Sequence, residues 1–150
     1  MITSIKNLLA KYTGSQQAGA DENGRALQLA TATLLMEVAR ADSHVSDEER
    51  QAICRAIETH YGLSPETTQQ ITRAAEHEAE HSTSLYPFTR LINRECDYQD
   101  KLQIIRMLWQ IICADGYTDK HEEHLVRRVA ELLHVPHREF IRAKLLAMET

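Results

Sequence analysis

The sequence predicts an all-α fold: a single-domain bundle of about seven to eight helices built on a duplicated helix-turn-helix hairpin. Residues that favour helices, above all Ala, Leu, Glu, Gln and Arg, dominate the composition. Signals for strands are poor, because aromatic residues make up only 5% of the chain and no turn dipeptide is flanked by alternating apolar and polar residues. A pattern of apolar segment, short acidic turn and amphipathic segment occurs twice.

The duplication is clearest in the second hairpin, Leu102–Leu133, and in an earlier copy that starts near Leu27. The acidic turns of the two copies align without a gap at an offset of 73 residues. This offset pairs residues of the same chemical kind: Asp42 with Asp115, Glu49 with Glu122, Leu29 with Leu102, Met36 with Trp109, and Ile53 with Val126. After the second helix of each hairpin the copies slip by one residue, so that Leu63 meets Val135.

The chain of 150 residues is long enough for one domain that buries a sizeable core. A net charge of −5 argues against binding to nucleic acid or to an anionic membrane surface. No apolar run reaches the length of a membrane span, since Arg106 and Gln110 interrupt the best one, and the start of the chain lacks the apolar core of a signal peptide. The three cysteines lie among apolar residues without metal-like spacing. We therefore expect a cytoplasmic protein with no membrane insertion and no nucleic-acid partner.

Residues 1–23 are expected to form a short helix at Ile2–Tyr12 followed by a flexible polar linker, and residues 24–150 to form the helical domain. The domain opens with a helix at Gly24–Ala41 whose apolar residues recur every three or four positions. Ser46 and Glu49 fit a capping box at the start of the next helix. Gly62 is placed to end that helix in a left-handed conformation.

Ser64 and Pro65 provide an N-cap and a first-turn proline for a helix that is polar, with only a thin apolar seam, and that we expect to be peripheral. A shorter helix follows Ser82–Ser84, and Asp97 or Asp100 caps the next one. That helix, about Tyr98 to Ala114, is apolar nearly all round and belongs in the centre.

The second turn repeats the signals of the first. Gly116 can stop the central helix, and Asp119 with Glu122 forms a second predicted capping box. Pro136 opens the last helix, where four apolar residues are expected to close the domain: Phe140, Ile141, Leu145 and Leu146.

The acidic turns are the first candidate site. Asp42 and Asp115 follow the C-terminal end of a helix, where the helix dipole disfavours a negative charge by about 0.3–1 kcal/mol. Each aspartate can accept hydrogen bonds from free N–H groups of its own turn, in which case the turn and the capping box have a structural role only. Alternatively, each can share a cation with the glutamate of the returning helix, Glu49 or Glu122. Carboxylate oxygens suit calcium or magnesium, although the spacing is too short for an EF-hand.

The second candidate is the sequence His77-Glu78-Ala79-Glu80-His81, which matches H-E-x-x-H. On a helix this motif places two imidazoles one turn apart with a glutamate beside them, as in zinc hydrolases. The surroundings are polar and no third zinc ligand lies at a known spacing, so we expect a solvated helix face and no enzyme. His121 and His124, three residues apart, are read as polar residues of a helix's first turn.

Two segments carry a family resemblance: VARADSHVSDEE at 38–49 and ICADGYTDKHEEHLVRRVAELLHV at 112–135. Both are similar to the acidic hairpins of the TerB-like family, and the resemblance extends from about Leu27 to Leu146. It implies an all-α domain without demonstrated enzymatic activity, linked to stress response and tellurite resistance, with metal sensing or scaffolding at the acidic turns. The family's pattern carries over to Asp42, Glu49, Asp115 and Glu122. The first turn departs from that pattern, because Ser43 stands where the second has Gly116.

We therefore expect a non-catalytic cytoplasmic module that binds a divalent cation, calcium or magnesium, or a protein partner at its two acidic turns. The alternative is a pure protein-interaction scaffold whose site is an apolar groove between helices.

Overall fold

The computed structural model describes residues 22–42, 44–114 and 120–149. All regular secondary structure in these ranges is helical. Seven α-helices and one short 3-10 helix lie in these ranges, and no strand does, which confirms the all-α prediction. In chain order they are α2 (Glu22–Ala39), η1 (Arg40–Asp42), α3 (Asp47–Tyr61), α4 (Pro65–His81), α5 (Tyr86–Glu95), α6 (Tyr98–Ile112), α7 (Lys120–Leu132) and α8 (His137–Met148). The helix predicted at Ile2–Tyr12 lies outside the described residues, and the domain division at residue 23 stays a prediction.

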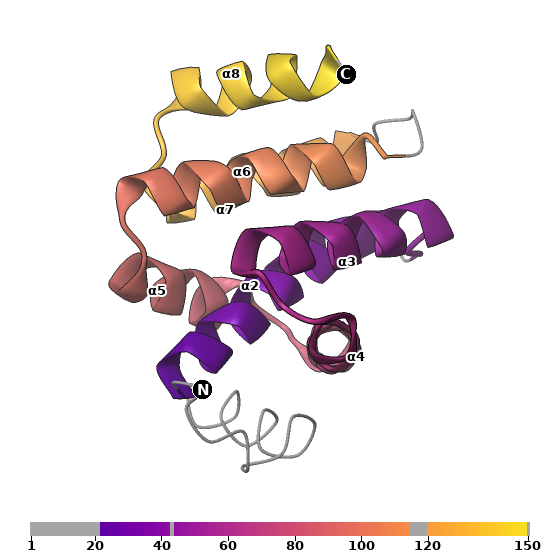
Figure 1. Cartoon of the computed structure of the whole chain (residues 1–150). Helices are drawn as coiled ribbons and strands as arrows, with labels where there is room; N and C mark the ends of the chain where they lie inside the picture. Colours follow the sequence, from indigo (N-terminus) through magenta and orange to yellow (C-terminus); the bar gives the residue numbers. More distant parts are fainter. Residues whose placement is uncertain (1–21, 43, 115–119, 150) are drawn as a thin grey trace.

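Two helices form the centre of the molecule. α2 runs through it and contacts α3, α4, α5, α6 and α7, as Figure 1 shows. α6 buries eight residues, including Trp109, as expected for a helix that is apolar nearly all round. None of the helices in the described ranges is both long and apolar enough to cross a membrane.

The ends of α3 and α7 preserve the duplication in detail. Gly62, with φ +63°, ends α3, and His134, with φ +61°, follows α7 at the equivalent position. This equivalence requires the one-residue slip that the sequence predicts. A backbone hydrogen bond of the same kind closes each end: Leu63 N to Glu58 O, 3.1 Å, and Val135 N to Ala130 O, 2.8 Å.

α4 lies at the edge of the bundle, as expected from its polar sequence, with its main contacts to α2 and α3. It packs closely along α2, and its buried face consists mostly of small residues: Thr68, Ile71, Thr72, Ala74, Ala75 and Ala79. Small side chains at a contact let two helix axes approach each other. A thin seam of Ala and Thr is therefore sufficient for tight packing, and the polar residues occupy the remaining surface.

α8 closes the domain with fewer residues than expected. Phe140 and Ala143 are buried against α6 and α7. Leu145 and Leu146, predicted to face the core, are 57% and 48% exposed. α8 is the outermost helix of its layer in Figure 1, and no other helix of the described ranges lies beyond it.

Candidate functional site

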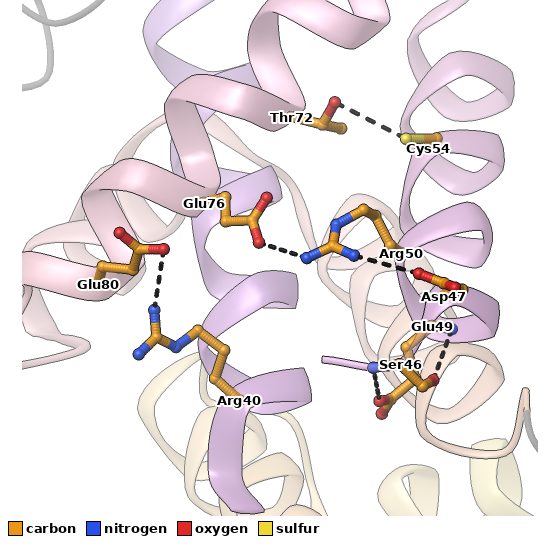
Figure 2. Close-up of polar contacts among 9 residues, drawn as sticks. All are labelled: Arg40, Ser46, Asp47, Glu49, Arg50, Cys54, Thr72, Glu76 and Glu80. Atoms are coloured by element: carbon orange, nitrogen blue, oxygen red, sulfur yellow. Dashed lines mark hydrogen bonds and ion pairs between the residues drawn. The ribbon is translucent and has the colours of Figure 1, made fainter. Parts of the chain in front are cut away.

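The first acidic turn joins α2, through η1, to the N-terminus of α3. Ser46 caps α3: its hydroxyl oxygen accepts the Glu49 backbone N–H at 3.1 Å. The Glu49 carboxylate in turn accepts the Ser46 backbone N–H at 2.9 Å, and Figure 2 shows both bonds. The predicted capping box is therefore present, and it satisfies two backbone N–H groups at the turn.

Glu49 and Glu122 occupy matching buried positions in the two hairpins. Each side chain is only 4% exposed, whereas Glu48 beside Glu49 is exposed and Glu123 beside Glu122 is half-buried. Both lie in the first turn of a helix, where the dipole favours a negative charge. η1 contacts α7, and the N-terminal ends of α3 and α7 lie at the same end of the bundle in Figure 1. The duplication therefore brings the two buried glutamates to one end of the molecule.

The aspartates of the predicted site are less fully described. The backbone of Asp42 ends η1, while its side chain, like all of Asp115 and Asp119, lies outside the described residues. The convergence of Asp42 with Glu49, and of Asp115 with Glu122, stays a prediction.

A second cluster lies at the C-terminal end of α4. His77, Glu80 and His81 each offer one ligand atom, and these three atoms all lie within 4.8 Å of one another. The rings of His77 and His81 are 4.5 Å apart between centroids. The sequence suggested the two histidines but not Glu80, although its spacing of three residues from His77 places both on one helix face.

Ion pairs connect α4 to the first acidic hairpin, as Figure 2 shows. Arg40 of η1 lies 3.8 Å from Glu80. The guanidinium of Arg50 on α3 lies 2.5 Å from the Glu76 carboxylate through Nη2, and 3.6 Å from the Asp47 carboxylate through Nη1. The carboxylates of α4 therefore contact arginines on both sides of the first turn.

Glu37 lies one turn before Arg40 on α2 and is half-buried. Within the described part of the chain, its buried oxygen Oε1 has no hydrogen-bond partner. Burial raises the pKa of Glu37 to about 7, with the positive charge of Arg40 opposing the rise and the negative charge of Glu78 adding to it. Glu78 is therefore close enough to α2 to influence Glu37, and it is not a member of the His77, Glu80 and His81 cluster.

A surface cavity of about 440 Å³ lies between α3 and α6. Ala52, Ala56 and Met107 contribute apolar atoms to its wall, while Arg55 and His60 contribute polar ones. The groove predicted for a scaffold was apolar, whereas this one is mixed. It suits a partner with both apolar and polar groups.

The three cysteines form no disulfide and are each half-buried. Burial raises the pKa of the Cys96 thiol to about 11, so this thiol stays protonated at neutral pH. Cys96 is therefore a poor nucleophile and a poor metal ligand.

In a comparison with known families, the model described as "Tellurite resistance protein TerB" matches residues 28–145, more than half of the chain. The matched range includes both hairpins and the helices between them. A search of curated proteins gives no match. A search of solved structures gives none either.

Proposed function

The chain belongs to the TerB family, and we propose that it is a non-catalytic, cytoplasmic stress-response module that binds a divalent cation at its two acidic inter-helix turns. Calcium or magnesium is the expected ion, because the ligands are carboxylate oxygens. Glu49 and Glu122 are the ligands from the returning helices, and Asp42 and Asp115 are those from the turns.

One observation carries this proposal: two glutamates at equivalent positions of a duplicated hairpin are both 4% exposed. Removing a carboxylate from water is costly unless hydrogen bonds or opposite charge compensate it. The cap and the helix dipole supply part of that compensation. A bound cation supplies further opposite charge to the glutamate. It also stabilises the negative charge of the aspartate that follows the C-terminal end of a helix in each turn, which the helix dipole disfavours.

The proposal is tested by calorimetric titration of the chain with calcium and with magnesium. We expect two ions to bind per chain. Glu49→Gln keeps the capping box, since glutamine serves at this position as glutamate does, but it removes the charge. We expect Glu49→Gln to lose one ion and Glu122→Gln to lose the other.

Glu48→Gln is the matched control, because it removes an exposed carboxylate from the same helical turn. It should bind both ions as the wild type does. Absence of both heat and thermal stabilisation in the wild type at millimolar calcium and magnesium would contradict the proposal. An equal loss in Glu48→Gln would contradict it as well.

The cavity between α3 and α6 favours a second candidate function, that of a protein-interaction scaffold. A partner bound there should stay bound when chelator removes divalent cations. Arg55→Glu, on the cavity wall, should release it, whereas Arg138→Glu, exposed on α8, should not. Retention of the partner by Arg55→Glu would exclude the cavity as its site.

A further inference from the structure

The last two turns of α4 hold three potential metal ligands that the acidic turns do not use. Glu80 and His81 lie three and four residues after His77, which places both beside His77 on the helix surface. Their ligand atoms lie within 4.8 Å of one another. All three side chains are exposed, so an ion reaches them directly from solvent.

The ring of His81 is held in place by the backbone of α4. Its Nδ1 lies 2.8 Å from the backbone carbonyl oxygen of His77. A carbonyl oxygen only accepts hydrogen bonds, so Nδ1 carries the proton and donates it. The other ring nitrogen, Nε2, then holds the free electron pair. This arrangement, in which one ring N–H bonds a backbone carbonyl, is the usual second shell of a metal-bound histidine.

We propose that His77, Glu80 and His81 form a binding site for a borderline transition-metal ion of the Zn²⁺ class. Two imidazoles and one carboxylate are a ligand set that Zn²⁺ accepts, and solvent completes the coordination. The site lies at the C-terminal end of α4, where the helix dipole favours positive charge. It is distinct in ligand type from the oxygen-only acidic turns.

Glu80 couples this site to the first acidic hairpin. Its carboxylate oxygen Oε1 lies 3.8 Å from the Arg40 Nη1 of η1, as drawn in Figure 2. Both side chains are substantially exposed, so the pair is weak and can be broken. A metal ion at the site therefore competes with Arg40 for Glu80, and Arg40 opposes binding by its own positive charge as well.

The test is calorimetric titration of the chain, produced without a histidine tag, with Zn²⁺. We expect His77→Ala, His81→Ala and Glu80→Gln each to weaken Zn²⁺ binding by about tenfold or more, since even second-shell partners of a metal are worth that much. Glu78→Gln is the matched control: it removes a carboxylate from the same helix that is not in the cluster. Its Zn²⁺ affinity should equal that of the wild type.

Arg40→Gln should change the Zn²⁺ affinity in the opposite direction. Removing the competitor of Zn²⁺ for Glu80 should strengthen binding by about two- to fivefold, as expected for the loss of one exposed ion pair. This gain cannot come from a variant that is merely misfolded. The gain should become smaller when Glu80→Gln is also present, because only the repulsion between the Arg40 charge and the ion then remains.

Three outcomes would overturn the proposal: no Zn²⁺ binding by the wild type, unchanged affinity in the histidine variants, or equal losses in Glu78→Gln and Glu80→Gln. His124→Ala separates this site from the exposed histidine pair on α7 and should leave Zn²⁺ affinity unchanged. Glu49→Gln should also leave it unchanged. Failure of the zinc site is thereby distinguished from failure of calcium or magnesium binding at the turns.

Discussion

Buried carboxylates are stabilised in different ways at different residues of this protein. Glu49 accepts a backbone N–H and lies at the positive end of a helix. Glu37 lies near the opposite end of its helix, and one of its oxygens is buried without a hydrogen-bond partner among the described residues. Protonation is the compensation available to Glu37, and its pKa rises accordingly to about 7.

Glu37 should therefore make stability depend on pH. Its pKa is about 7 in the folded protein, against an ordinary value of 4.5, so between these pH values the folded state holds a proton that the unfolded state has lost. Stability conferred by this group is then greatest below pH 4.5 and is lost as the pH rises through 7. The glutamine of Glu37→Gln does not titrate. The free energy of unfolding of this variant should therefore exceed that of the wild type by about 1–2 kcal/mol at pH 8, after allowance for the partial exposure of residue 37.

Urea denaturation at pH 5 and pH 8 measures this difference. The stability advantage of Glu37→Gln should be smaller at pH 5, where the side chain at position 37 is largely neutral in the folded state of both proteins. Glu48→Gln, an exposed substitution of the same kind, should show no such change with pH. A stability difference between Glu37→Gln and the wild type that is the same at both pH values would contradict the assignment.

Site residues differ in how far the sequence alone predicts them. The capping role of Glu49 depends on Ser46, three residues away, so a local pattern is sufficient. The burial of Glu49 and Glu122 depends on the packing of separate hairpins, which the capping pattern does not contain. Glu80 was missed because the H-E-x-x-H pattern draws attention to Glu78, while contact with α2 places Glu78 near Glu37.

At the scale of elements, the helix ends follow local rules more closely than the packing does. Ser64 with Pro65 and Asp97 begin α4 and α6 as predicted. The burial of the last turn of α8 was predicted wrongly, and the sequence did not indicate how closely α4 packs along α2. Apolar content overstates the burial of an outermost helix and understates that of a helix packed through small residues.

The two equivalent helix ends, Gly62 and His134, allow a matched test. Both residues have a left-handed backbone, which costs about 1 kcal/mol for a residue with a Cβ atom. We expect His134→Gly to stabilise the protein by about 0.5–1 kcal/mol and Gly62→Ala to destabilise it by about 1 kcal/mol. A Cβ at Gly62 meets no atom within 4 Å, so backbone conformation alone sets that cost.

Chemical denaturation of the two variants gives these free energies of unfolding. The double variant should come close to the wild type, because the two helix ends belong to different hairpins and additive effects are expected. Destabilisation by His134→Gly would show that the imidazole makes a compensating interaction, and the conformational explanation would then fail.

At the scale of the whole molecule, the two hairpins share one core. Buried residues from every described α-helix belong to a single hydrophobic cluster. α2 of the first hairpin contacts α6 and α7 of the second. The side-chain amide of Asn93 on α5 donates to the backbone oxygen of Leu132 at 2.9 Å, which ties the connecting segment to the end of α7. Neither hairpin therefore buries its apolar face alone.

A shared core predicts that damage to either hairpin unfolds both. Trp109, the single tryptophan of the chain, is fully buried on α6 with its ring 5.2 Å from that of Phe140, so its fluorescence reports on the second hairpin. Ile53→Ala, in the first hairpin, should lower stability by about 2–5 kcal/mol, and its counterpart Val126→Ala by somewhat less, since it removes fewer carbon atoms from the core. In both variants the fluorescence transition should coincide with the loss of helix measured by circular dichroism, as in one cooperative unit. If Ile53→Ala instead left the fluorescence transition in place while part of the helical signal was lost earlier, the hairpins would be independent folding units and the shared core would not couple them.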